Sequence, residues 1–217
     1  MLIDMHVHTS ETSLCAEISA RKLVEKYKAL GYDGFVVSDH MKPDELQSLE
    51  VKSWRKKAEY WLRGYRKAKA AAGKDFTVLL GMEIRFLDSH NDYLLYGIDE
   101  DFVFKNSNLH KYRSLRAFRP LAEKHGVLIV QAHPFRRTMT ICDHKLLDGM
   151  EVLNANHENN NEIAKLWAEK YGLIPTAGTD YHGWGDVHYG LRLKEFVRDS
   201  KELARVLRSR KYEIVVK

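Results

Sequence analysis

"MLIDMHVHTS", residues 1–10, opens the chain and combines a short apolar run with two closely spaced histidines. The alternation over Leu2–Val7 predicts a β-strand whose apolar side chains share one face, namely Ile3, Met5 and Val7. His6 and His8 then project together from the end of that strand. Imidazole is a common ligand of zinc, manganese and iron. Two surface histidines near a terminus would give the same pattern, so the rest of the chain has to decide.

Further apolar runs alternate with amphipathic stretches along the remainder of the chain. The runs that predict strands cover residues 34–40, 77–86, 92–98, 127–133, 149–155, 173–182 and 212–216. The stretches that predict helices cover residues 19–30, 44–72, 113–125, 158–171 and 200–209. Repeated strand–helix units predict an α/β fold with a parallel sheet, either closed as a barrel or open and doubly wound. In both architectures, active sites gather at the C-terminal ends of the strands.

The composition is that of a globular protein, with 217 residues of which 44% are hydrophobic and 30% charged. The length suits a single domain over residues 1–217. No run approaches the roughly 20 apolar residues of a membrane span, and the N-terminus lacks a signal-peptide pattern, so we expect no membrane partner. The two cysteines, Cys15 and Cys142, make no disulfide framework, and we expect a cytoplasmic protein. The oligomeric state is left open by the sequence.

The net charge of +5 is concentrated in one segment, Lys52–Lys74, where Glu59 is the only acidic residue. Its apolar residues recur at helical spacing, which predicts an amphipathic helix with a basic outer face. Such a face could meet nucleic acid or another anionic partner. A solvated surface is the simpler interpretation, because long basic side chains often cover helices with their charged ends in water.

Ionisable side chains follow several of the predicted strands at the same end. They are His6 and His8, Asp39 and His40, Glu83, His133, and Asp180 with His182. So many imidazoles and carboxylates exceed the needs of one tetrahedral ion, and they imply two or three divalent ions of zinc, manganese or iron. Glu83 follows an apolar stretch, where a carboxylate bridging two cations would offset the cost of burial. Each residue alone also has an ordinary interpretation, such as a turn cap or a salt bridge between Glu83 and Arg85.

Five motifs together resemble one family. "DMHVHTS" (4–10), "VVSDH" (36–40), "GMEIRF" (81–86), "AHPFR" (132–136) and "GTDYH" (178–182) are similar, in this order, to those of the polymerase and histidinol phosphatase, or PHP, family. The resemblance implies an α/β fold of the distorted (β/α)7 barrel type, with a trinuclear metal centre at the C-terminal ends of the strands. It also implies hydrolysis of phosphate esters.

The resemblance also implies a distribution of metal ligands. His6, His8, Glu83 and Asp180 would hold the first metal, Glu83 and His133 the second, and His40 and His182 the third. Two positions differ from the family. Where the family usually has a histidine, this chain offers Asp92, with His90 and Asn91 nearby; where it has a histidine or aspartate after the first motif, this chain offers Glu11 and then Cys15. A thiolate at Cys15 would favour zinc, whereas a carboxylate at Glu11 would suit manganese or iron.

The expected activity is that of a phosphatase, which hydrolyses a small phosphomonoester through a metal-bound hydroxide. Arg136 is expected to bind the phosphate through its planar fork, whereas Arg85 either does the same or forms a structural salt bridge. His182 or Asp39 would protonate the leaving group. The alternatives are a nuclease-like phosphodiesterase guided by the basic segment, an amide or lactone hydrolase of the amidohydrolase type, and a metal-stabilised scaffold without turnover. The sequence identifies neither the substrate nor the metal.

Overall fold

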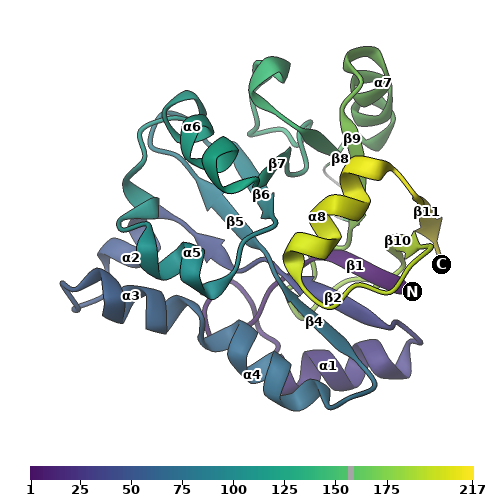
Figure 1. Cartoon of the computed structure of the whole chain (residues 1–217), viewed down its shortest axis with the longest axis horizontal. Coiled ribbons are helices and arrows are strands. Elements are labelled where there is room, and N and C mark those ends of the chain that lie inside the picture. The colour runs from purple at the N-terminus through teal and green to yellow at the C-terminus, as the bar shows by residue number, and fades with distance from the viewer. Residues whose placement is uncertain (156–158) are drawn as a thin grey trace.

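Strands and helices alternate along most of the computed structural model, which describes residues 1–155 and 159–217 (Figure 1). The strands are β1 (Leu2–Val7), β2 (Gly34–Val37), β3 (His40–Met41), β4 (Thr77–Leu80), β5 (Met82–Arg85), β6 (Asp92–Tyr96), β7 (Leu128–Gln131), β8 (Gly149–Asn154), β9 (Ile174–Gly178), β10 (Tyr189–Leu193) and β11 (Tyr212–Val216). The α-helices are α1 (Ala20–Ala29), α2 (Pro43–Gln47), α3 (Trp54–Trp61), α4 (Arg63–Ala72), α5 (Glu100–Lys105), α6 (Leu115–His125), α7 (Asn161–Tyr171) and α8 (Ser200–Ser209). Two single turns of 3-10 helix cover Leu109–Lys111 and His144–Leu146.

Most predicted elements are present with small shifts at their ends. The strand β1 and the helix α8 have the predicted bounds. The predicted helix over residues 44–72 is three helices, α2, α3 and α4, and the predicted start of α7 at residue 158 lies outside the described residues. The sequence prediction missed β10 and α5. No described helix is long and apolar enough to cross a lipid bilayer.

The strands pair into two sheets. One has the order β11-β10-β1-β2-β4, and the other has the order β3-β5-β6-β7-β8-β9. The prediction of a uniformly parallel sheet is wrong at β6, which runs antiparallel to both β5 and β7, and at β10, which runs antiparallel to β1. The connection from β5 to β6, residues 86–91, is too short for a parallel crossover, which needs about a dozen residues or more. The observed pairing therefore shows a mixed α/β fold and does not by itself close a barrel.

The two sheets adjoin at Gly81, which separates β4 from β5 within one predicted strand. The Gly81 amide donates to the Val37 carbonyl at 2.9 Å, and a Cβ at this position would lie 2.6 Å from the Val36 side chain. Only glycine fits this close approach. The chain thereby passes from one sheet to the other immediately before Glu83. On the other side, the His8 amide of the first sheet donates to the Tyr181 carbonyl after β9 at 3.0 Å.

Two hydrophobic clusters bury the faces of these sheets. The inner cluster includes Ile3 and Met5 together with side chains of α8, and the outer cluster lies beneath helices such as α1, α4 and α6. Val7 belongs to the outer cluster, contrary to the prediction that it shares a face with Ile3 and Met5, because the β1–β2 register shifts between Asp4 and Val7. The helices α1 and α4 pack side by side along one edge of the molecule (Figure 1).

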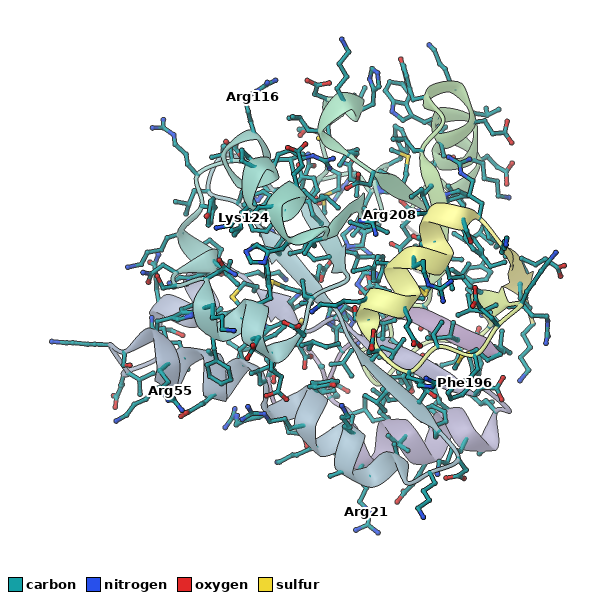
Figure 2. The ribbon with its side chains drawn as sticks, in the orientation of Figure 1. Arg21, Arg55, Arg116, Lys124, Phe196 and Arg208 are labelled. Carbon is teal, nitrogen blue, oxygen red and sulfur yellow. The ribbon has the colours of Figure 1, made fainter. Side chains whose placement is uncertain are left out.

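The basic segment forms much of α3 and α4, and its cations are partly paired with acids. Arg55 lies 3.3 Å from Glu59, Lys67 lies 3.6 Å from Glu11, and Arg66 forms an ion pair with Glu100. Figure 2 labels Arg55 on α3, and its guanidinium carbon lies 5.7 Å from the centroid of the Phe104 ring. These exposed pairs reduce the positive potential of this face, so the segment behaves largely as a solvated helix surface.

His110 is fully buried against α3, and neither of its ring nitrogens has a hydrogen-bond partner. Its ring stacks on Trp54 at a centroid distance of 5.8 Å. Burial, with the charges of Lys57 and Lys111, lowers the pKa of His110 from 6.5 to about 4. Because the unfolded chain takes up this proton more readily, the stability contributed by neutral His110 is present above pH 6.5 and is lost as the pH falls toward 4.

We therefore expect His110→Phe to flatten the acid-induced loss of stability, by at most about 1.4 kcal/mol per pH unit. Urea unfolding of the metal-stripped protein at several pH values measures this slope. The variant His125→Gln, at an exposed position of α6, should keep the wild-type slope. An unchanged slope in His110→Phe would contradict the prediction.

Candidate metal centre

His6, His8, Glu83 and Asp180 form the first of three ligand groups at one edge of the sheets. The two Nε2 atoms of His6 and His8 lie 3.0 Å apart, and Oδ1 of Asp180 lies 3.3 and 3.2 Å from them. The Glu83 carboxylate lies 3.6 Å from His6 and 3.5 Å from His8. Donors held about 2.0–2.2 Å from a tetrahedral ion lie about 3.3–3.6 Å from one another. This spacing fits a single metal ion.

Glu83 lies at the middle of the centre and contacts histidines on several sides. Its Oε1 lies 3.0 Å from Nε2 of His133, and its Oε2 lies 2.6 Å from Nδ1 of His40. Although burial opposes the shift, His40 and His6 hold the pKa of Glu83 well below its usual range. Three buried atoms, Glu83 Oε2, His40 Nδ1 and His133 Nδ1, have no hydrogen bond of acceptable geometry within residues 1–155 and 159–217. Converging donor atoms without partners among protein groups fit residues that bind metal.

The protonation states of the first histidines also fit this role. Burial and the neighbouring His182 and His40 lower the pKa of His8 well below its usual range, which favours the neutral ring that metals bind. The pKa of His6 is raised well above its usual range, because Glu151, Asp180 and Glu83 outweigh the effect of burial. A metal at this position would replace the proton on His6 and neutralise the same carboxylates.

The second group consists of Glu83, Asp92 and His133. Asp92 reaches this edge because β6 is antiparallel to β5, so that the beginning of β6 lies beside the end of β5, with Arg85 paired to Asp92. Arg85 also donates to both oxygens of Asp92, through Nε at 2.8 Å and Nη2 at 2.7 Å. The sequence left Arg85 between a salt bridge and phosphate binding, and here it forms the salt bridge, with Asp92 and not with Glu83.

The third group consists of His8, His40 and His182. The Nδ1–H of His182 donates to the Asp180 carbonyl at 2.7 Å, which leaves its Nε2 available 3.5 Å from Nε2 of His40. The Sγ atom of Cys15 lies 3.2 Å from the same His40 nitrogen. Against the effect of burial, contacts with His182 and His40 lower the pKa of the Cys15 thiol to about 6.

Glu11, a candidate metal ligand, and Asp39, a candidate general acid, are both hydrogen-bonded to protein groups. Glu11 belongs to none of the three groups, and its Oε2 accepts the amide of Ala20 at the start of α1 at 2.9 Å. The Asp39 carboxylate accepts the Thr9 amide at 2.7 Å, the Thr9 hydroxyl at 2.7 Å and the Ser13 hydroxyl at 2.8 Å. Burial raises the pKa of Asp39 to about 6. Asp39 therefore holds the loop after β1 in place beneath the histidines.

Two buried carboxylates that support the site were missed from the sequence. Glu151 on β8 accepts the His133 amide at 2.8 Å and pairs with Nδ1 of His6 at 2.9 Å. Asp4 on β1 accepts the hydroxyl of Tyr27 at 2.7 Å and the hydroxyl of Thr179 at 2.6 Å. The contact of Glu151 with Nδ1 fixes the orientation of the His6 ring, as is usual for metal-binding histidines. The available signal was a single carboxylate inside each of two apolar strands, "LIDMHV" and "GMEVLN".

Arg136 and a small pocket lie next to the first group. The Nη2 atom of Arg136 donates to Oδ2 of Asp180 at 2.7 Å, and its buried Nε has no partner among the residues that the structure describes. The pocket has a volume of about 130 Å³ and is lined by Asp180, Trp184 and His188 among others. Both His133 and Asp180 have positive φ angles, 28° and 55°, in a region that costs non-glycine residues about 1–3 kcal/mol each. Such strain is found where a fixed side-chain position matters.

Several solved structures share the fold of this chain. The chain is similar to a two-domain protein containing predicted PHP-like metal-dependent phosphoesterase from Bacteroides vulgatus, with a TM-score of 0.70 and 14% identity. The match covers 99% of this chain but only 64% of that chain, which is less than two thirds of its length. PsfC from Pseudomonas syringae gives a TM-score of 0.71 with 16% identity, covering 100% of this chain and 91% of that chain. Endonuclease Q, in complex with a 27-mer duplex substrate with an abasic lesion, gives a TM-score of 0.64 with 12% identity. This match covers 96% of this chain and 57% of that chain. No curated protein matches.

The sequence itself matches a family model over nearly its whole length. The model is that of the PHP domain, and it matches residues 4–213. This range includes all three ligand groups and the carboxylates that support them. The chain therefore belongs to the PHP domain family.

Proposed function

We propose that this PHP domain is a metal-dependent phosphoesterase that releases phosphate from a small phosphomonoester. The observation that carries the proposal is that the three ligand groups adjoin one another, since Glu83 belongs to the first and second and His8 to the first and third. Adjoining groups would hold two or three divalent cations side by side. When bound, such cations supply Lewis acidity that activates water at neutral pH and stabilises charge on a transferring phosphoryl group.

We assign the ligands by these groups. His6, His8, Glu83 and Asp180 hold one cation, and Glu83 bridges to a second that Asp92 and His133 also hold. His40 and His182 hold the third. The donors are mostly imidazole nitrogen and carboxylate oxygen, which suit zinc, manganese or iron.

Arg136 is the residue that we assign to the substrate. It lies beside Asp180, to which its Nη2 donates, and among the described residues its buried Nε has no hydrogen-bond partner. A guanidinium group binds phosphate oxygens in a planar, bidentate manner. We assign Asp39 to positioning, because its carboxylate is enclosed by Thr9 and Ser13, and His182 to the metal.

A phosphodiesterase acting on nucleic acid is the second candidate. The structural similarity to Endonuclease Q favours it, since that protein is described with a DNA duplex substrate. The ion pairs of α3 and α4 count against it, because they neutralise cations that would otherwise attract a strand.

Phosphate release from a panel of monoesters, with a dinucleotide diester alongside, tests the proposal. The protein is loaded separately with zinc, manganese and iron(II), and Asp180→Ala is the control that removes a ligand of the first group. We expect turnover of at least one monoester, which is lost in Asp180→Ala. Cleavage of the diester alone would favour the second candidate. Stoichiometric metal binding without any turnover would contradict both.

We also infer that residues 1–217 form one domain around a distorted seven-stranded barrel. Three backbone contacts between the sheets support this: the Gly81 amide donates to the Val37 carbonyl, the Glu83 amide donates to the Asp39 carbonyl, and Val7 forms a parallel bridge with Tyr181. We propose a cytoplasmic location, because Cys15 and Cys142 are both free thiols, which suit a reducing compartment.

A further inference from the structure

The third ligand group is incomplete once the first group is filled. His8 belongs to both groups, but its Nδ1 faces the Ser13 hydroxyl at 3.3 Å, which leaves only Nε2 for a metal. That Nε2 lies 3.0 Å from His6 and 3.2 Å from Asp180, so it serves the first group. His40 and His182 then remain as two ligands, whereas a stable zinc-type site needs at least three from the protein.

Cys15 is placed to supply the missing ligand. Its Sγ lies 3.2 Å from Nε2 of His40, and that nitrogen lies 3.5 Å from Nε2 of His182. These separations resemble the roughly 3.3–3.6 Å expected between sulfur and nitrogen ligands of one tetrahedral ion.

The loop that carries Cys15 is fixed on both sides of the thiol. Before it, the Ser13 hydroxyl donates to Asp39 at 2.8 Å, and the Thr12 hydroxyl donates to the Trp61 carbonyl at 3.0 Å. After it, the Glu17 amide donates to the carbonyl of His182 at 2.6 Å. These contacts on both sides of Cys15 fix the loop and thereby place the sulfur beside His40 and His182.

The other nearby donor is already engaged. Glu11, four residues earlier, accepts the Ala20 amide at 2.9 Å and lies 3.6 Å from Lys67. Cys142, the second cysteine, has its sulfur 3.7 Å from the Tyr93 hydroxyl. Among the described residues, Cys15 is therefore the side chain that completes the third group.

We propose that Cys15 binds as a thiolate, with His40 and His182, and makes the third site selective for zinc and similar thiophilic metals. The thiol loses its proton to solvent when the metal binds. Three protein ligands leave one tetrahedral position open for water or substrate, as in catalytic zinc sites. The first and second sites, with imidazole and carboxylate ligands alone, lack this preference, so the centre would bind two kinds of metal. The proposal rests on the proposed function only in requiring that the centre binds metal.

Cobalt(II) substitution tests the sulfur ligand directly, because thiolate bound to cobalt gives a charge-transfer absorption band that imidazole and carboxylate do not. We expect the band in the wild-type protein and in Cys142→Ser, and its loss in Cys15→Ser with a fall in cobalt content of about one ion per chain. Cys15→His should restore the cobalt content without restoring the band. A band that persists in Cys15→Ser, or a fully loaded wild type without the band, would overturn the proposal.

Alkylation provides a second readout that does not depend on activity. Bound zinc should protect Cys15 from iodoacetamide by about tenfold or more, since it holds the thiolate, while Cys142 reacts at the same rate with and without zinc. Mass spectrometry of peptides distinguishes the two cysteines. Phosphate release is measured on the same samples: turnover without the cobalt–sulfur band contradicts the ligand assignment alone, whereas the band without turnover contradicts the proposed function alone.

Discussion

Glu83→Gln is expected to lose most of the metal bound by the first and second groups and to reduce phosphate release by about a thousandfold, the equivalent of several kcal/mol. The carboxylate belongs to both groups and lies within 3.0 Å of His133 and 2.6 Å of His40. An amide keeps the shape of the side chain but has one acceptor oxygen and no charge. It therefore cannot bridge two cations. Elemental analysis gives the metal content, and a phosphate-release assay gives the rate.

Glu59→Gln is the matched control, because Glu59 lies on the exposed face of α3 in an ion pair with Arg55. It should keep the wild-type metal content and rate, since an exposed pair contributes little. Circular dichroism of both variants shows whether the fold is retained. Full metal content in a folded Glu83→Gln protein would refute the bridging role.

Glu151→Gln is expected to weaken metal binding by about 10–100-fold, although Glu151 would not itself bind the metal. Its two oxygens face three groups: Oε1 pairs with His6 at 2.9 Å, and Oε2 accepts the His133 amide at 2.8 Å and the Asn154 side chain at 2.9 Å. Glutamine must place its NH2 group against one of these donors. The His6 ring or the backbone at His133 then loses its fixed position.

Competition with a metal chelator measures this change in affinity. Saturating metal should restore most of the turnover in Glu151→Gln, which distinguishes a positioning residue from a ligand such as Asp180. Glu162→Gln, at an exposed position of α7 beside Lys165, is the control and should bind metal like the wild type. If Glu151→Gln bound metal with the wild-type affinity, the Glu151 carboxylate would contribute nothing to the site.

The ligands that could be predicted are those at the C-terminal end of a strand, because such ends gather at one edge in parallel α/β folds. His6 and His8 come from β1, His133 follows β7 and Asp180 follows β9, and the structure brings all four to one edge. Asp92 was harder to place, because it begins β6 instead of ending it, and only the antiparallel pairing with β5 makes it a neighbour of Glu83.

Residues that are candidates for the same role could be separated only by the fold. The sequence offered Glu11 first and Cys15 second, yet Glu11 accepts the amide of Ala20 at the start of α1, while Cys15 lies 3.2 Å from His40. Arg85 and Arg136 were both candidates for the substrate, yet Arg85 uses both arms of its fork on Asp92. A one-dimensional pattern reports the type of a side chain but not which partner it meets across the sheets.

By itself, the sequence determined most of the strand–helix order, the family and the kinds of donor atoms at the centre, because apolar periodicity and local motifs are encoded residue by residue. The tertiary structure decided the antiparallel direction of β6, the division of the sheets at Gly81 and the roles of Glu151 and Asp4. These depend on contacts between segments far apart in the chain. A buried carboxylate is held by whichever donors surround it, and those donors are known only when the strands have packed.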